Sequence, residues 1–593
     1  MNQSSSLSST AASSSIVEDM ANVGGPTMLK RTLGLQNDRY SKHIGATTDF
    51  EPALLNVSQY DTQDETVLSR GTLRKVSDRD AFLLLSDSAT PQFDQIVKDA
   101  EAIEDIVAPH GRNLVNLFFK TVHPSFPVLQ KHVFLEGYER DYRETSPPLL
   151  AAVYLLALNW WDHCDELSSH PRPDASKLEK LLRYSLADAM ARPKLSLIQA
   201  GLLLSQRPNG DQWVPTAQLV AVGQEVGLHL DCAHWKIPPW EKGLRKRLAW
   251  ALYMQDKWGS LIHGRPSHIF HSNWAVRGLT SNDFPDVEWD ESDPDEKHDI
   301  EKGRLIFTRF VHLSQIIAEI LETFYSLQAM HVVDHAGAQG AHLILSHAKP
   351  IQLKLKEWYG SLPPVIRLES FSTGLQPNEE RPSSIGYLHL GYFAAEITLH
   401  RRIVRSMSSN SPSVDSYIQH ICRSAAKARL ISAMDFVNRL TPNHLRSFWY
   451  FASKASFALI GTFGSLLWAT SPAREEADWY RRRLAEYRWT LSVSSQPGEG
   501  KSLTEFAMTM LDLSTGLVKQ LPEKPMMSRV QSAAEFSGPG GLASLSNIPS
   551  LVGSFSHLPS TEGSSVHSLG ATDDESSEEN DDDEMNDFAR HRA

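Results

Sequence analysis

Residues 241–256 read EKGLRKRLAWALYMQD, and this stretch decides the fold class of the chain. Its apolar residues recur every three or four positions, which predicts an α-helix with one apolar stripe. Arg245 and Arg247 fall beside the stripe, so we expect both guanidinium groups on a solvated face of the helix. The stripe consists of Leu244, Leu248, Ala251, Leu252 and Gln255.

The same periodicity extends outward in both directions, from about residue 93 to about residue 525. Pro147 can open one helix, and Asp174 can cap another. Strand signals are rare, and the short apolar run at 81–85 is consistent with a docking segment or a strand-like turn. The sequence therefore predicts an all-α fold with about a dozen helices in a single large multi-helix domain.

The two ends of the chain differ from its middle in composition. Serine dominates residues 1–15, and the chain beyond residue 526 is rich in serine, glycine, proline and acidic residues. Segments of this kind bury too little apolar surface to fold. We therefore expect four parts. These are a largely disordered N-terminal segment (1–92), a helical region (93–370), a C-terminal helical part of the same body (371–525) and a disordered acidic tail (526–593).

Charge and cysteine content exclude several classes of protein. The net charge is −13, with no strongly basic region, which argues against an autonomous nucleic-acid binder. Three scattered cysteines do not form a disulfide framework, so a reducing compartment is expected. The N-terminus shows no apolar signal-peptide core. The longest apolar run, 455–469, is shorter than the roughly 20 residues that a membrane span needs, so we expect a soluble intracellular protein without a membrane partner.

Three short motifs resemble catalytic or metal sites but lack what that chemistry requires. The stretch PGEGKS at 497–502 has Ser495 where a phosphate-binding loop needs a glycine. The run DDDE at 581–584 lies in the polar tail, without an apolar helix face to fix the carboxylates around magnesium. His163 and Cys164 are adjacent in sequence, so their side chains do not point to one side of a helix.

A catalytic thiolate is also disfavoured. His229 and Cys232 have the right residue types, but only Lys236 adds positive charge nearby. An all-α enzyme would need carboxylates or paired histidines converging from facing helices, and the sequence offers no such set. We therefore expect no catalytic, cofactor-binding or metal-binding residues, and we expect that the protein is not an enzyme.

Five elements in a fixed order resemble a known family. They are the FxxxxHPxFP element with Phe118, Pro124 and Pro127, LSLIQAGLLLS at 195–205, VGQEVGLHLD at 222–231, the 241–256 helix, and SLIHGRPSHI at 260–269. This set resembles the middle homology region of fungal zinc-cluster transcription factors, the fungal-specific transcription factor domain, over residues 107–370. The stretches MQDKW at 254–258 and HGRPSH at 263–268 further resemble TamA-type coactivators of nitrogen metabolism. Leu230 and Ala249 depart from the family pattern, where arginine and tryptophan are usual.

The residues of these motifs are expected to hold the fold rather than to bind a ligand. Asp256 lies near Trp250 and Tyr253, and a carboxylate in apolar surroundings needs a cationic partner. Arg265, just after the Gly264 turn, is the first choice for that partner and Arg247 is the second. The predicted structural residues are Asp256, Arg265, Arg247, Gly264, Pro266, Trp250, Tyr253, Pro124 and Pro127.

The family's DNA-binding element is not found in this sequence. A zinc cluster needs six cysteines, whereas this chain has three. Either the cluster was lost from a truncated gene model, or the protein is a member that regulates without one. We therefore expect no cofactor in this chain, and zinc only if an upstream cluster was lost.

The resemblance implies a transcriptional regulator or coactivator with a helical regulatory domain, located in the nucleus and able to shuttle to the cytoplasm. It would act through other transcription factors or coactivators and reach DNA indirectly or through the missing cluster, in the control of metabolism and specifically of nitrogen utilisation. A homodimer and a heterodimer both stay open. Runs 245–247 and 481–483 are interpreted as solvated faces, with nuclear localisation as the alternative. The alternatives for the whole chain are a helical scaffold without transcriptional output and an all-α enzyme.

Overall fold

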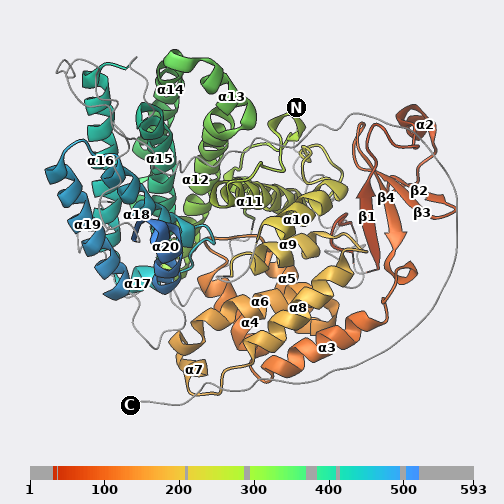
Figure 1. The fold of residues 1–593 in the computed structure, drawn as a ribbon. Helices are drawn as coiled ribbons and strands as arrows, with labels where there is room; N and C mark the ends of the chain where they lie inside the picture. The colour runs from red at the N-terminus through yellow and green to blue at the C-terminus, as the bar shows by residue number, and fades with distance from the viewer. Residues whose placement is uncertain are drawn as a thin grey trace, which may run out of the picture. The chain divides into compact units, whose positions relative to one another are not determined.

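The computed structural model describes residues 31–36, 38–207, 212–285, 294–368, 383–408, 414–493 and 503–519. Helices dominate these residues, and the predicted all-α class is confirmed, with one small sheet added (Figure 1). The expected disorder of residues 1–30 and of the acidic tail lies outside the described residues. The motifs at 497–502 and 581–584 lie outside them as well.

The expectation of a largely disordered segment over residues 1–92 is wrong for its described part. Four antiparallel strands form a sheet in the order β1-β4-β3-β2. The apolar run at 81–85 forms β4, whose Phe82 and Leu84 pack in a small separate core with Trp235 and Ile237. Cys232, Trp235 and Ile237 of this core come from a loop about 150 residues away, so local composition gave little sign of it. The strands are Arg39–His43 (β1), Glu65–Leu68 (β2), Gly71–Lys75 (β3) and Ala81–Ser86 (β4), and a short helix, Pro52–Val57 (α2), lies between the first two.

A first group of helices follows the sheet. Every residue of α6 is buried, because α6 packs against α3, α4, α8 and α9. Asp174 caps α8 as predicted, since its carboxylate accepts hydrogen bonds from the backbone N–H groups of Ser176 and Lys177. The helices are Gln95–Val107 (α3), Gly111–Thr121 (α4), Lys131–Arg140 (α5), Pro147–Ala157 (α6), Asp165–Ser168 (α7), Ala175–Ala189 (α8), Leu195–Leu204 (α9) and Trp213–Glu225 (α10).

Helix α11, Pro239–His263, contains residues 241–256, whose periodicity predicted a helix. It contacts α9 and α10 of the first group and α12 of the second, so it joins the two groups (Figure 1). The second group consists of Pro294–Tyr325 (α12), Leu327–His335 (α13), Gly340–Gly360 (α14), Ile385–Ser408 (α15), Ser416–Asn438 (α16), Pro442–Leu445 (α17), Ser453–Ala469 (α18), Arg474–Val493 (α19) and Leu503–Lys519 (α20).

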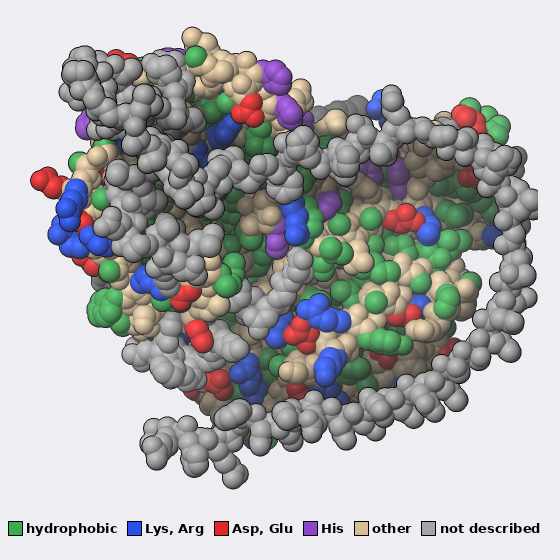
Figure 2. Space-filling model, in the orientation of Figure 1, with side chains coloured by type: hydrophobic (Ala, Val, Ile, Leu, Met, Phe, Trp, Pro, Cys, Tyr) green, Lys and Arg blue, Asp and Glu red, His purple; other side chains and the backbone are tan. Residues whose placement is uncertain are grey.

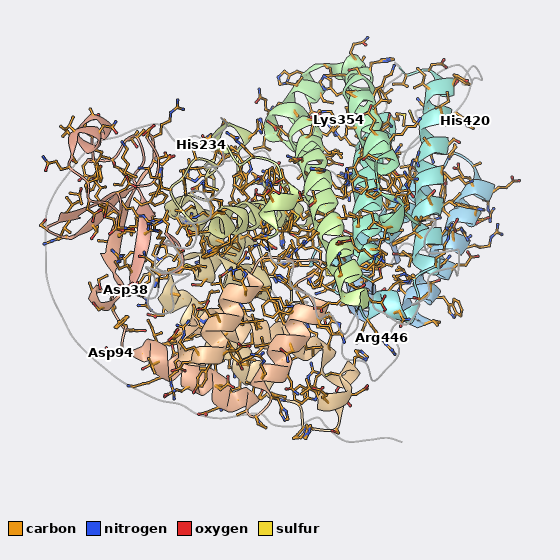
Figure 3. All side chains as sticks on the ribbon, turned by 180° about the vertical axis from the view of Figure 1, so that it is seen from behind. Asp38, Asp94, His234, Lys354, His420 and Arg446 are labelled. Carbon is orange, nitrogen blue, oxygen red and sulfur yellow. The ribbon has the colours of Figure 1, made fainter. Side chains whose placement is uncertain are left out.

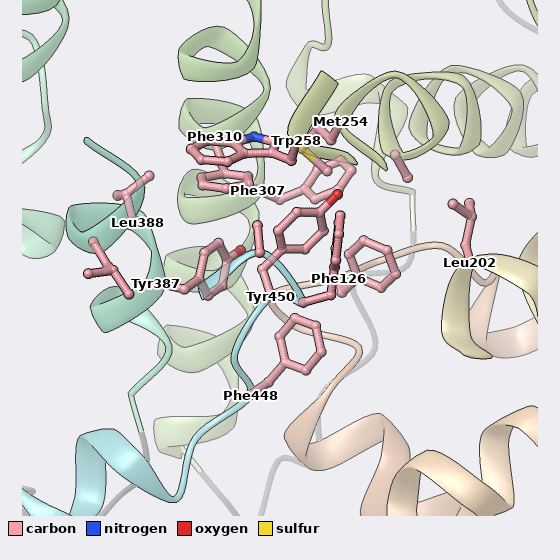
Figure 4. Close-up of a cluster of buried hydrophobic side chains, with 14 of the residues drawn as sticks. Phe126, Leu202, Met254, Trp258, Phe307, Phe310, Tyr387, Leu388, Phe448 and Tyr450 are labelled. Atoms are coloured by element: carbon pink, nitrogen blue, oxygen red, sulfur yellow. The ribbon is translucent and has the colours of Figure 1, made fainter. Parts of the chain in front are cut away.

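An aromatic cluster connects segments that are distant in sequence (Figure 4). Trp258 of α11 stacks on Phe310 of α12, with ring centroids 5.0 Å apart and an interplanar angle of 8°. The Tyr387 hydroxyl of α15 donates a hydrogen bond of 3.0 Å to the backbone oxygen of Ser125. The rings of Trp258, Phe310 and Tyr387 are buried, and so is Phe126. The loop at 123–130 is therefore held in place by contacts from several helices.

None of the described helices combines the length and the apolar character that crossing a membrane requires.

Candidate functional site

The C-terminal end of α11 holds Asp256 in a buried polar pocket. Its carboxylate accepts backbone N–H hydrogen bonds from His268 at 2.8 Å and from Ile269 at 3.2 Å. Lys257 pairs with it at 3.2 Å. Side-chain groups of Ser267 and His268 also contact it. Most hydrogen bonds to the Asp256 carboxylate therefore come from residues 267–269 in the turn that follows the helix.

The predicted partners of Asp256 were wrong. Gly264 ends α11 in the left-handed conformation with φ of 62°, and this turn brings residues 267–269 back to Asp256. Arg265 and Pro266 instead lie exposed at the outside of the turn. Arg247 is also not its partner, because its guanidinium is used elsewhere on the helix.

Two aromatic residues of the motif line the same end of α11. The Trp250 indole donates a hydrogen bond of 2.9 Å to the backbone oxygen of Arg277. The Lys257 ammonium lies 4.9 Å from the ring centroid of Tyr253. Burial lowers the pKa of Lys257, and the nearby Asp256 carboxylate opposes that shift. These contacts indicate a structural role for Trp250, Tyr253 and Lys257.

Arg247 connects α11 to the loop that contains the FxxxxHPxFP element. Its guanidinium donates hydrogen bonds to the backbone oxygens of Pro127 at 3.0 Å and Leu129 at 3.2 Å, and to Oε1 of Gln130 at 2.5 Å. The side chain is buried, so the expected solvated face is wrong at this position. The sequence could not show this, because the acceptors lie almost 120 residues away.

Arg245 and Glu241 form a second buried pair on α11. The Nε atom of Arg245 lies 2.9 Å from Oε1 of Glu241, and the side chains are only 2% and 0% exposed. Glu241 also accepts hydrogen bonds from the backbone N–H groups of Leu33 at 2.9 Å and Gly34 at 3.0 Å. The expectation of a solvated Arg245 is therefore also wrong. The i,i+4 spacing of Glu241 and Arg245 was the available sequence signal for this pair.

Pro124 packs directly against helix α12. A Cβ atom at Gly303 would lie 2.2 Å from the carbonyl oxygen of Pro124, so this close approach requires glycine. Together, Pro124 and Pro127 fix the loop between α12 on one side and Arg247 on the other.

A cavity of about 540 Å³ lies beside these two anchored segments. Leu129 and Gln130, which Arg247 holds, form one part of its wall, and Leu35 and Gln36, next to the Glu241 anchor, form another. The side chains of Asp94 and Val97 at the start of α3 are exposed, so the cavity opens to solvent there (Figure 3 labels Asp94). Apolar wall residues include Phe93, Ile96, Val133, Phe134, Leu149 and Leu197.

The cations in the cavity wall are already paired with carboxylates. Lys194 pairs with Asp87 and donates a further hydrogen bond of 2.6 Å to the backbone oxygen of Gln36. Arg192 pairs with Asp188. Burial raises the pKa of Asp87, against the effect of Lys194, and burial lowers the pKa of Lys194, against the effect of Asp87.

Three buried acceptor atoms in the wall lack a hydrogen-bond partner among the described residues. They are Oε1 of Gln36, Oδ1 of Asp87 and Oε1 of Gln199. The Gln199 side-chain amide donates a hydrogen bond of 2.9 Å to the backbone oxygen of Val128, and this bond fixes the orientation of the Gln199 side chain. The sequence does not predict this cavity, because its wall is assembled from segments spread over more than 160 residues. Gln199 lies in the LSLIQAGLLLS element and was the one hint.

The other candidate sites considered from the sequence gain no support from the structure. No group of three or more potential metal-ligating side chains occurs among the described residues. Cys232 is buried, its thiol contacts the backbone oxygen of Lys242 at 3.7 Å, and burial raises its pKa, the opposite of what a thiolate nucleophile needs. On the face seen in Figure 2, basic and acidic side chains lie interspersed in small groups.

Comparison with known proteins gives three kinds of result. The model of the fungal specific transcription factor domain matches residues 115–360. Over 499 residues the chain is 37% identical to the transcriptional activator protein DAL81 of Saccharomyces cerevisiae, covering 78% of this chain and 50% of that protein. It is 25% identical to the acetamidase regulatory protein of Aspergillus fumigatus over 374 residues, 60% of this chain and 42% of that protein.

A further relative is the uncharacterized transcriptional regulatory protein C25B8.11 of Schizosaccharomyces pombe. It is 33% identical over 238 residues, which cover 39% of this chain and 35% of that protein. The chain thus spans half or less of the length of these relatives. No solved structure matches.

Proposed function

This chain contains a fungal specific transcription factor domain, and from that membership we propose that it regulates transcription in the nucleus through protein partners. The observation that carries the proposal is the 37% identity to a transcriptional activator protein over 78% of this chain. The proposed output is activation, as in the name of that relative.

Contact with DNA is proposed to lie outside the described residues. Arg245 and Arg247 belong to a basic run, but both are buried and bonded within the protein, so they are not available to phosphates or to an import receptor. The three cysteines of the chain are too few for a zinc cluster. We propose that DNA is reached through partner transcription factors or through a cluster outside this sequence, and that this chain itself needs no cofactor.

The regulated genes are proposed to serve metabolism, in particular nitrogen utilisation. Support comes from the resemblance of residues 254–258 and 263–268 to nitrogen-metabolism coactivators and from the relation to acetamidase regulatory proteins. Transcript profiles of a strain lacking the gene, grown on different nitrogen sources, test this assignment. An unchanged response to the nitrogen source would contradict it.

A tethering experiment tests transcriptional output directly. The full chain is fused to a heterologous DNA-binding domain and placed upstream of a reporter. We expect activation by the fusion and none by the DNA-binding domain alone. A stable, nuclear fusion without reporter output would instead support the scaffold alternative.

A further inference from the structure

We infer that the cavity beside the 127–130 loop binds a small organic molecule with an apolar body and a cationic, hydrogen-bond-donating nitrogen head. Its volume of about 540 Å³ is in the range of about 300–1,000 Å³ typical of small-molecule sites. The apolar wall, formed by side chains such as Phe93, Val133 and Leu149, would contact the body of the ligand. Binding at this cavity does not depend on the proposed transcriptional role.

The polar groups of the wall select the sign of the ligand's charge. Lys194 and Arg192 are neutralised by Asp87 and Asp188, and Arg143 pairs with Glu101 at 2.9 Å. Among the residues that the structure describes, no cation pairs with Asp99, a buried residue of the wall that accepts a hydrogen bond of 3.0 Å from the side-chain amide of Gln95. The wall therefore has an uncompensated carboxylate, which favours a cation and disfavours an anion.

The unpartnered hydrogen-bonding atoms point to the same chemistry. Gln36, Asp87 and Gln199 each carry a buried oxygen without a donor among the described residues, and all three atoms are acceptors. A buried acceptor left without a donor destabilises the folded protein. A ligand that donates N–H groups to Gln36 or Asp87 after a small side-chain rotation would supply the missing donor, whereas a carboxylate or phosphate ligand would not.

The site is placed to influence helix α11. The wall residues Gln130 and Leu129 accept hydrogen bonds from Arg247, and Gln36 lies two residues beyond Gly34, which Glu241 holds. A ligand that displaces Leu129 or Gln130 therefore perturbs the hydrogen bonds of Arg247 on α11. A ligand that displaces Gln36 perturbs the segment that is hydrogen-bonded to Glu241, also on α11. The same helix contacts α12, so the site is connected to the second group of helices.

A matched pair of probes tests the inference on the full chain. The first probe is 2-phenylethylamine, and the second is 3-phenylpropionate, which has the same ring but a carboxylate head. Saturation-transfer NMR and thermal shift report binding of each. We expect saturable binding of the amine and at least about tenfold weaker binding of the carboxylate.

Two variants locate the binding to this cavity. Gly137 lies on α5 in the wall, and a Cβ there meets no atom within 4 Å, so Gly137→Leu should fill space in the cavity without a clash. We expect it to abolish binding of the amine, whereas Gly360→Leu, at another open helical position, should not. Asp99→Asn should weaken amine binding by about tenfold, and Asp105→Asn, on the exposed side of the same helix, should not.

Three outcomes would overturn the inference. These are no saturable binding of 2-phenylethylamine, equal binding of both probes, and unchanged binding in Gly137→Leu. Because Gly137→Leu replaces a helical glycine, it is expected to fold at least as well as the parent, so loss of binding with an unchanged melting temperature supports the site.

Discussion

The Arg247 guanidinium lies 3.0 Å from the carbonyl oxygen of Pro127 and connects two sequence motifs that are 120 residues apart. The same side chain reaches Leu129 and Gln130, so one residue of α11 positions the whole loop. Because Gln130 and Leu129 also line the cavity, a residue with a structural role here also shapes a candidate binding site.

Arg247→Ala is expected to destabilise the protein strongly. The change leaves three buried oxygens without their donor, which in general costs about 1–3 kcal/mol per group, so we expect a loss of about 3–5 kcal/mol in the free energy of unfolding. Urea denaturation measures it. Arg481→Ala is the control, since that arginine is 71% exposed and should change little. Equal losses of unfolding free energy in Arg247→Ala and Arg481→Ala would contradict the hydrogen-bond network of Arg247.

Asp256 and Arg265 are expected to behave very differently. Asp256→Ala removes the carboxylate that pairs with the buried Lys257 and that accepts hydrogen bonds from two backbone N–H groups, and breaking a buried charge pair from one side costs about 3–5 kcal/mol. Arg265→Ala, at an exposed turn position, should leave the melting temperature unchanged. Thermal melts of both variants distinguish the observed arrangement from a direct pair between these residues, for which the two losses would be similar.

The sequence predicted the regular features of this fold and missed those that depend on distant partners. Helical periodicity identified α11, and the capping aspartate identified the start of α8, because both signals are local. Whether Arg245 and Arg247 face solvent depends on carbonyl groups of Val226 and Pro127, which no local pattern encodes. The same spacing that suggested a solvated basic run is compatible with two buried guanidinium groups.

The candidate site was harder to predict for a related reason. Its wall combines Gln36, Asp87 and Gln199, which belong to the N-terminal segment, the end of the sheet and α9. Each is unremarkable in its own segment. The turn after α11 gave a similar error: Gly264 was correctly chosen as a turn, but its left-handed conformation directs residues 267–269, and not Arg265, toward Asp256.

Acidification is expected to destabilise the protein through two buried histidines of α15. Burial lowers the pKa of His389 and of His400 to about 4, from an ordinary value of 6.5. The unfolded chain therefore takes up protons first, and the free energy of unfolding should fall as the pH is lowered from about 6.5 to about 4. At about 1.4 kcal/mol per pKa unit, each histidine would contribute a loss of roughly 3 kcal/mol.

Urea denaturation at several pH values between 7 and 4.5 measures this dependence. His400→Leu should make the slope shallower, because the group that takes up a proton on unfolding is removed. His420→Leu, at an exposed position of α16, is the control and should leave the slope as in the parent (Figure 3). A steeper or unchanged slope in His400→Leu would show that this histidine is not buried in its neutral form.

Two helical glycines are expected to respond in opposite directions to the same substitution. Gly303→Ala places a methyl group 2.2 Å from the carbonyl oxygen of Pro124, and neither backbone can yield without moving α12 or the 123–130 loop. We expect a loss of at least about 1–3 kcal/mol. Gly137→Ala meets open space in α5 and should gain up to about 1 kcal/mol, since alanine favours the helix more than glycine does. The denaturation midpoints of the two variants show whether each substitution stabilises or destabilises the protein. If Gly303→Ala were as stable as the parent, the close contact between α12 and the FxxxxHPxFP element would be refuted, and with it the anchoring of the cavity wall from that side.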